Sequence, residues 1–202
     1  MSRNKLAISL ALLVAYSLSV HLGMISGHTL PALILLGSVF SLAVISSGRW
    51  LLLPLIPLIL YLLWSWKSAA ALLLLPPILI NLLLALVFAS TLVPGATPLI
   101  TQFSHIMKGD LDAKALRYTR QVTFAWVGFF VLMAIEAVIL ALYAPPFVWS
   151  LFTNLLNYLF IILFFFIEYL LRIRRFTDVE HLSFIDFMLS LAKVDLKCIK
   201  TF

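Results

Sequence analysis

Two histidines are each followed five positions later by an aspartate, His105 by Asp110 and His181 by Asp186. Some membrane-associated acyltransferases use this spacing, with the histidine as general base and the aspartate orienting its ring. Each aspartate also fits a capping position: Asp110 can cap the helix that follows it, and Asp186 has capping-box spacing from Ser183. The flanking segments are too short to form a substrate pocket. We therefore expect no catalytic residue here, and a membrane acyltransferase is only a distant alternative.

Polar side chains that interrupt apolar stretches form a second candidate site. Five of them fall at comparable depth when they are measured along helices at about 1.5 Å per residue: His21, Asn81, Glu136, Asn154 and Asn157. An ionisable group at such depth is costly and usually faces a partner or a cavity. The predicted polar layer is either a proton- or substrate-binding site or a set of interhelical hydrogen bonds, worth about 0.6 kcal/mol each, that fixes packing.

Basic side chains at the ends of apolar stretches form a third candidate site, for an acidic partner. Its members are Lys114, Arg117, Arg120, Arg172, Arg174 and Arg175. They can dock an acidic protein partner, or they can contact lipid headgroups at about 1 kcal/mol per basic residue. Glu168 lies four positions before Arg172, which predicts an ion pair on one helix face. Because these residues flank membrane helices, nucleic-acid binding is a poor interpretation.

The composition places all three candidates in a membrane protein. The 202 residues are 64% hydrophobic and 11% charged, whereas soluble domains have about 25% charged residues. One cysteine, Cys198, cannot form an internal disulfide or a cysteine-based metal site. The sequence contains no phosphate-binding glycine loop, nucleophile elbow or helical metal-ligand spacing, and we expect neither metal nor cofactor.

Apolar stretches long enough to approach or reach the width of a bilayer predict an all-α, polytopic fold in one integral membrane domain over 1–202. The six predicted spans are about 6–25, 29–47, 51–66, 69–93, 122–143 and 147–171. Positive residues stay on the cytoplasmic side of short loops. With both termini inside, 13 of the 14 Lys and Arg residues are cytoplasmic, and only Lys67 is outside. The charge distribution therefore predicts a multi-pass protein with both termini in the cytoplasm.

Two short amphipathic helices are predicted at the cytoplasmic interface, at about 98–108 and 184–196. Thr97 has the character of an N-cap with Pro98 at the first helical position, and Gly109 is typical of a helix end. Spans five and six are joined by only three residues, 144–146, so they should be antiparallel neighbours whose inner ends bring the basic residues into one patch.

The second half of the chain, roughly 94–190, resembles a family of uncharacterised bacterial inner-membrane proteins encoded with aryl polyene and fatty-acid-type synthases. The shared motifs are Pro98-Leu99-Ile100-Thr101-Gln102-Phe103, Arg117-Tyr118-Thr119-Arg120-Gln121-Val122-Thr123-Phe124-Ala125-Trp126, Trp149-Ser150-Leu151-Phe152-Thr153-Asn154 with Tyr158, and Glu168-Tyr169 before 172–176. The resemblance implies a bacterial inner (cytoplasmic) membrane location and an accessory role in making or delivering a polyene lipid. It implies no reaction.

These observations leave two classes of function. The first is a non-enzymatic accessory or scaffold subunit that docks acyl carrier or synthase partners on the basic cytoplasmic face. The alternative is a transporter or flippase for the lipid product, which would use the polar layer.

Overall fold

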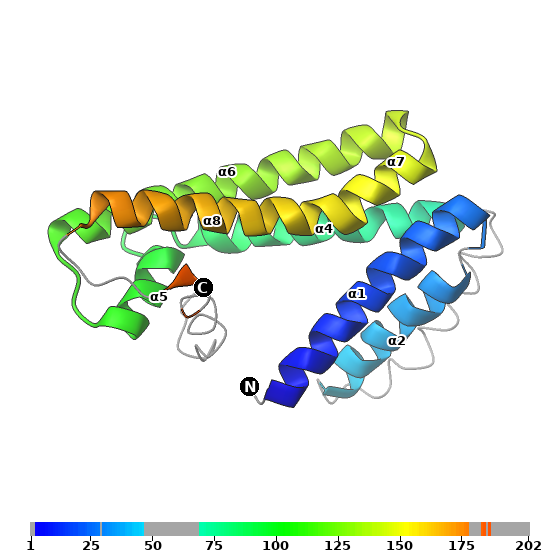
Figure 1. Ribbon diagram of the computed structural model, residues 1–202, viewed down its shortest axis with the longest axis horizontal. Helices are drawn as coiled ribbons and strands as arrows, with labels where there is room; N and C mark the ends of the chain where they lie inside the picture. Colours follow the sequence, from blue (N-terminus) through cyan, green and yellow to red (C-terminus); the bar gives the residue numbers. More distant parts are fainter. Residues whose placement is uncertain (1–2, 29, 47–68, 178–182, 185, 187–202) are drawn as a thin grey trace. The chain divides into compact units, whose positions relative to one another are not determined.

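The computed structural model describes residues 3–28, 30–46, 69–177, 183, 184 and 186, and every element within them is a helix (Figure 1). In chain order the helices are α1 (Arg3–Ser26), α2 (Leu30–Ser46), α4 (Ala69–Ser90), α5 (Leu99–Lys108), α6 (Ala113–Tyr143), α7 (Pro146–Leu151), the π-helix η2 (Phe152–Leu156) and α8 (Asn157–Arg175). The all-α prediction is confirmed for this part of the chain.

Three stretches among the described residues are long and apolar enough to cross a membrane: Leu73–Ser90, Ala113–Tyr143 and Pro146–Arg175. They coincide with the predicted spans 69–93, 122–143 and 147–171. The predicted spans 6–25 and 29–47 are helical as α1 and α2, whereas span 51–66 lies outside the described residues. Six crossings and the inward orientation of both termini therefore stay predictions.

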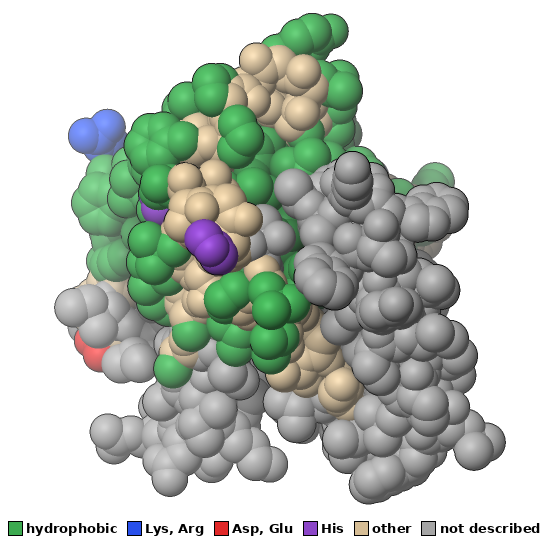
Figure 2. All heavy atoms as spheres, turned by 90° about the vertical axis from the view of Figure 1, so that its right-hand side faces the viewer, with side chains coloured by type: hydrophobic (Ala, Val, Ile, Leu, Met, Phe, Trp, Pro, Cys, Tyr) green, Lys and Arg blue, Asp and Glu red, His purple; other side chains and the backbone are tan. Residues whose placement is uncertain are grey.

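Much of the described surface is formed by large apolar side chains, as in helices that face lipid. Leu86, Leu132 and Leu142 are each more than 60% exposed. Figure 2 shows a face that is mainly hydrophobic where it is described, with charged side chains only near its left-hand margin. Exposed apolar area on this scale marks a membrane or protein interaction surface.

The chain divides into two compact units. Unit 1 contains Ile80–Ile135 and Tyr158–Phe202, and unit 2 contains Ser2–Leu79 and Glu136–Asn157. Each unit has its own hydrophobic core. The assignment of 1–202 to one integral membrane domain stays a prediction.

The core of unit 1 is aromatic. Trp126 of α6 is 2% exposed, and its ring centroid lies 4.5 Å from those of both Phe164 and Phe165 of α8. Phe88 of α4 and Phe130 of α6 pack on the same indole. Aromatic pairs at such separations add about 0.5–1.5 kcal/mol each beyond the burial of their area. These contacts fix α6 beside α8 within unit 1.

Helix α5 is attached to unit 1 by buried threonines. The first helical N–H, that of Leu99, donates to Thr91 Oγ1 (2.9 Å), and the N–H of Ile100 donates to Thr123 Oγ1 of α6 (3.2 Å). A third contact joins the hydroxyls of Thr101 and Thr119 at 2.7 Å. The amides at a helix start need acceptors from outside the helix, and here distant hydroxyls supply them.

The predicted ends of α5 and the start of α6 need two corrections. Pro98, not Thr97, is the N-cap of α5, and no side chain caps that end locally. Asp112, not Asp110, caps α6: its Oδ1 accepts the N–H of Ala115 at 2.8 Å. The predicted stop at Gly109 is confirmed, because this residue has φ 78°, a conformation that glycine adopts easily.

In unit 2, α1 packs against α2, α7 and η2. The buried core residues are Val20, Ala32, Leu33, Leu73 and Trp149. The end of α6 joins this core through Leu140, Ala141 and Ala144. The apolar contacts therefore hold the hairpin of α6 and α7 against α1.

Candidate functional site

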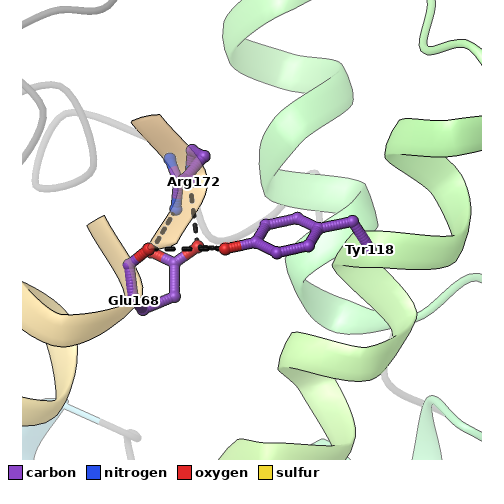
Figure 3. A network of polar contacts seen from close by, with 3 residues as sticks. All are labelled: Tyr118, Glu168 and Arg172. Atoms are coloured by element: carbon purple, nitrogen blue, oxygen red, sulfur yellow. Dashed lines mark hydrogen bonds and ion pairs between the residues drawn. The ribbon is translucent and has the colours of Figure 1, made fainter. Parts of the chain in front are cut away.

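The basic end of unit 1 is organised around one buried carboxylate. Glu168 is 6% exposed and accepts a hydrogen bond from Arg172 Nε at 3.0 Å, while Arg172 Nη2 contacts its second oxygen. The Tyr118 hydroxyl of α6 donates to the Glu168 carboxylate and to its backbone carbonyl, each at 3.3 Å (Figure 3). The predicted Glu168–Arg172 pair is thus confirmed, and a tyrosine from another helix completes it.

Two cations lie over aromatic rings across the same helix pair. Lys114 of α6 has its Nζ 5.1 Å from the ring centroid of Phe176, which follows α8. Conversely, the guanidinium of Arg175 lies 5.5 Å from the Tyr118 ring centroid. Tyr118 and Phe176 contact edge to face at 5.4 Å. Cation–π contacts at exposed sites contribute about 0.5–1 kcal/mol each, and here they orient two charges at one place.

We call the six predicted basic residues the basic collar: Lys114, Arg117, Arg120, Arg172, Arg174 and Arg175. The contacts above bring Lys114, Arg172 and Arg175 together. Arg117 and Arg174 are exposed on the same two helix ends. Arg120 donates from Nη2 to the Leu92 carbonyl at 3.0 Å, so this arginine also anchors the segment after α4.

The collar keeps an excess of positive charge. Glu168 is the one carboxylate that forms an ion pair with a collar residue among the described residues, and it pairs with Arg172. Four exposed cations remain available to an anion: Lys114, Arg117, Arg174 and Arg175. Arginine presents planar, bidentate donors that match carboxylate and phosphate groups. The arrangement is suited to binding an anionic surface.

The histidine–aspartate pairs do not form a catalytic arrangement in the described part of the chain. His105 Nδ1 donates to the Gly109 carbonyl at 3.0 Å, within the end of α5. His181 lies outside the described residues. Ser183 Oγ accepts the N–H of Asp186 at 3.2 Å, as the capping-box spacing predicts, and it donates to Asp186 Oδ2 at 2.7 Å.

Unit 2 contains a second polar arrangement, centred on Ser150. His21 Nδ1 of α1 and the Ser150 hydroxyl of α7 are hydrogen-bonded at 2.9 Å. Asn154 donates from Nδ2 to the Ser150 carbonyl (3.3 Å) and to Thr153 Oγ1 (3.1 Å). We call the buried or half-buried polar side chains here the polar seam: Ser17, His21, Ser150, Thr153, Asn154 and Asn157.

The polar seam contains three of the five residues of the predicted layer. His21 and Asn154 both bond to Ser150, and Asn157 is 6% exposed on the same helical run. Glu136 also belongs to unit 2, whereas Asn81 is buried in unit 1. Sequence reasoning missed Ser17, Ser150 and Thr153. Their spacing gave a signal: Ser17 precedes His21 by four positions, and 150, 153, 154 and 157 share one helix face.

Some side chains of unit 2 have buried polar atoms without a hydrogen-bond partner among the described residues. Among them are both carboxyl oxygens of Glu136, Nε1 of Trp149 and Oδ1 of Asn157. A buried donor or acceptor left unpaired costs about 1–3 kcal/mol. The sequence had indicated Glu136 and Asn157 but not Trp149.

No group of three His, Cys, Asp or Glu side chains that could hold a metal ion occurs in the described part of the chain. No protein-family model, curated protein or solved structure matches this sequence. The resemblance of 94–190 therefore stays an expectation, and the geometry of the collar and the seam is the basis for the functional inference.

Proposed function

We propose that this protein is a non-enzymatic accessory subunit of a bacterial inner membrane that docks an acidic soluble partner on its basic collar. The partner would be an acyl carrier protein or a ketosynthase, and the process the biosynthesis or delivery of an aryl polyene-type lipid. The observation that supports docking is the contact of Tyr118 and Arg172 with one buried carboxylate, Glu168. The lipid pathway rests on the sequence resemblance alone.

Pre-organisation favours a protein partner over lipid headgroups as the ligand of the collar. Binding immobilises long side chains at a cost of about 0.5–1.5 kcal/mol each. Lys114 and Arg175 already lie over the Phe176 and Tyr118 rings, which lowers this cost. Mobile headgroups adapt to any arrangement of cations, so a fixed arrangement adds little to the free energy with which they bind. Pre-organised cations increase the affinity for a folded acidic protein most, because the charges of that protein are also fixed in place.

Charge reversal at exposed collar residues tests the proposal. The wild-type protein is placed in uncharged phosphatidylcholine nanodiscs, and its affinity for a purified bacterial acyl carrier protein is measured. Arg117→Glu and Arg174→Glu should each weaken binding about fivefold or more, and the loss should shrink as salt increases. Neither side chain makes a contact within the described residues that its reversal would break.

Lys67→Glu is the matched control, because it makes the same change in charge at the predicted outer side. It should leave the affinity unchanged. If the collar variants bind the carrier as tightly as the control does, in a correctly inserted protein, the docking proposal is wrong.

A transporter or flippase is the second candidate, and the polar seam is the observation that favours it. Polar groups within apolar spans commonly line substrate pathways, and the His21–Ser150 bond joins two helices of unit 2. Transfer of a fluorescent polyene lipid between the leaflets of proteoliposomes would support this function. Transfer at the rate of protein-free vesicles would exclude it for that lipid.

A further inference from the structure

Three members of the basic collar form one row on the exposed side of α6. Lys114, Arg117 and Arg120 recur at every third position, and all three are exposed. Tyr118 and Thr119, which lie between them in the sequence, are buried and contact α8 and α5. Residues three apart on a helix are surface neighbours, with Cβ atoms about 5–6 Å apart. We call this row of three cations the basic ridge.

Contacts within unit 1 hold both ends of the basic ridge. At one end, the Lys114 ammonium lies over the ring of Phe176. At the other end, Arg120 donates from Nη2 to the Leu92 carbonyl at 3.0 Å. A guanidinium has five N–H donors, so this bond leaves Arg120 able to bind an anion as well. The two outer cations are therefore held in place before a partner binds, with Arg117 between them.

The charge of the basic ridge opposes the dipole of its own helix. The N-terminus of an α-helix carries partial positive charge, so anions are favourable there and cations are unfavourable. Lys114 is the second residue of α6, and the first turn contains no acidic residue. Asp112 caps this helix end, but no ridge residue forms an ion pair with a carboxylate in the described part of the chain. An anionic partner would therefore stabilise both the ridge and the helix end.

The spacing of the basic ridge distinguishes between kinds of anion. A single phosphate group is too small to contact three cations that extend over six residues, about 9 Å along the helix axis. Carboxylates on a second α-helix have matching spacing, because residues three or four apart are again about 5–6 Å apart. An extended strand places residues of one face about 6.6 Å apart, so its carboxylates move progressively out of register with the ridge.

From this spacing we propose that the basic ridge binds a partner α-helix with a row of Asp or Glu residues, at positions i, i+3 or i+4, and i+7. Each carboxylate faces one cation of the ridge, and the two arginines can form bidentate pairs. The inference rests on the proposed docking function and specifies its ligand, which is a helical row of carboxylates and not a phosphate group.

Two synthetic helical peptides of equal composition, charge and helicity test this inference. One has three Glu residues in a single row, and the other has the same three spaced evenly around the helix. Each is titrated at low salt against the full-length protein in uncharged phosphatidylcholine nanodiscs. The row peptide should bind about tenfold more tightly, and inorganic phosphate at the same total carboxylate concentration should not displace it. Equal affinities, no measurable binding of either peptide, or displacement by phosphate would overturn the proposal.

A pair of arginine variants locates the preference on the ridge. Arg117→Gln removes the middle cation, and Arg174→Gln is the matched control, because Arg174 is an exposed collar arginine of α8 outside the ridge. Arg117→Gln should reduce the advantage of the row peptide from about tenfold to about twofold or less. Arg174→Gln should weaken the binding of both peptides equally and leave the ratio of their affinities unchanged. An equal fall of this ratio in both variants would contradict the ridge.

The peptide experiment can fail independently of the docking function. If Arg117→Glu weakens binding of the acyl carrier protein while the two peptides bind equally, docking stands and the helical row of carboxylates is wrong. If the row peptide is preferred but the carrier protein does not bind, the ridge inference stands and the carrier is the wrong partner.

Discussion

The hydroxyl of Tyr118 donates a hydrogen bond to Glu168, a residue 50 positions later in the chain. This bond joins the first turns of α6 to the last turns of α8. The same carboxylate also receives two donors from Arg172. The positions of Tyr118 and Arg172 at the collar therefore depend on one acidic residue that is almost fully buried.

Replacement of Glu168 by Gln should reduce stability more than the loss of the Tyr118 hydroxyl. Gln keeps the shape but leaves the Arg172 charge without a counter-ion, and we expect a loss of about 1–3 kcal/mol, against about 1 kcal/mol for Tyr118→Phe. Because the residues share a network, the double variant should show a coupling of at least about 0.5 kcal/mol. Denaturant unfolding in detergent measures the free energy of unfolding of the two single variants and of the double variant.

Tyr143→Phe is the control for this cycle, because Tyr143 is 82% exposed. It should change stability by less than about 0.5 kcal/mol. Strict additivity of Tyr118→Phe and Glu168→Gln would show that the two side chains do not interact in the folded protein.

Thr123→Val should loosen the start of α5. Valine has nearly the shape of threonine but cannot accept the Ile100 N–H, which then loses its partner. We expect a loss of about 1 kcal/mol and hydrogen exchange roughly tenfold faster at the Ile100 amide. Thr97→Val, at an exposed position of the same segment, should leave that exchange unchanged. Equal protection in both variants would mean that Thr123 does not hold α5.

Cysteine labelling should distinguish the two sides of the predicted topology. In a Cys198→Ser background, an impermeant reagent added to intact cells should modify Pro145→Cys and spare Asp110→Cys. Both positions are exposed, and Asp110 is a better choice than Gly109, whose positive φ strains any other residue. Labelling at Asp110 alone would invert the charge-based orientation.

His105→Ala should leave product formation within a few-fold of the wild type. The Nδ1 of this histidine is engaged by the Gly109 carbonyl, and loss of a true general base costs about 100-fold or more. Product per cell, normalised to the amount of membrane protein, is the measurement. A 100-fold loss at unchanged protein level would make the acyltransferase the leading interpretation.

Local sequence rules predicted the features that depend on neighbouring residues. The Glu168–Arg172 pair and the end of α5 at Gly109 follow from spacings of a few positions, and both are confirmed. The same rules chose the wrong cap for α6, because Asp110 and Asp112 are equally good capping residues and only the exact helix start distinguishes them.

Features that depend on distant segments could not be read from the sequence. The packing of α6 against α8 decides whether Tyr118 forms a hydrogen bond with Glu168. The packing of α6 against α5 decides whether Thr123 accepts the N–H of Ile100. The π-turn at Phe152–Leu156 is equally hidden, since apolar periodicity does not reveal one extra residue in a turn. The six predicted collar residues were identifiable because their common property, charge at helix ends, is local.

The length of α6 has a consequence for competition at the collar. This helix has 31 residues and is about 46 Å long, whereas the hydrocarbon core of a bilayer is about 30 Å thick. In the proposed orientation its first nine residues, about 13 Å of helix, stand among the lipid headgroups. Phosphate groups of anionic lipids then occupy the same arginines as a docking protein does. The lipid composition of the inner leaflet would thereby set how much partner the membrane recruits, and a rise in anionic lipid would release it.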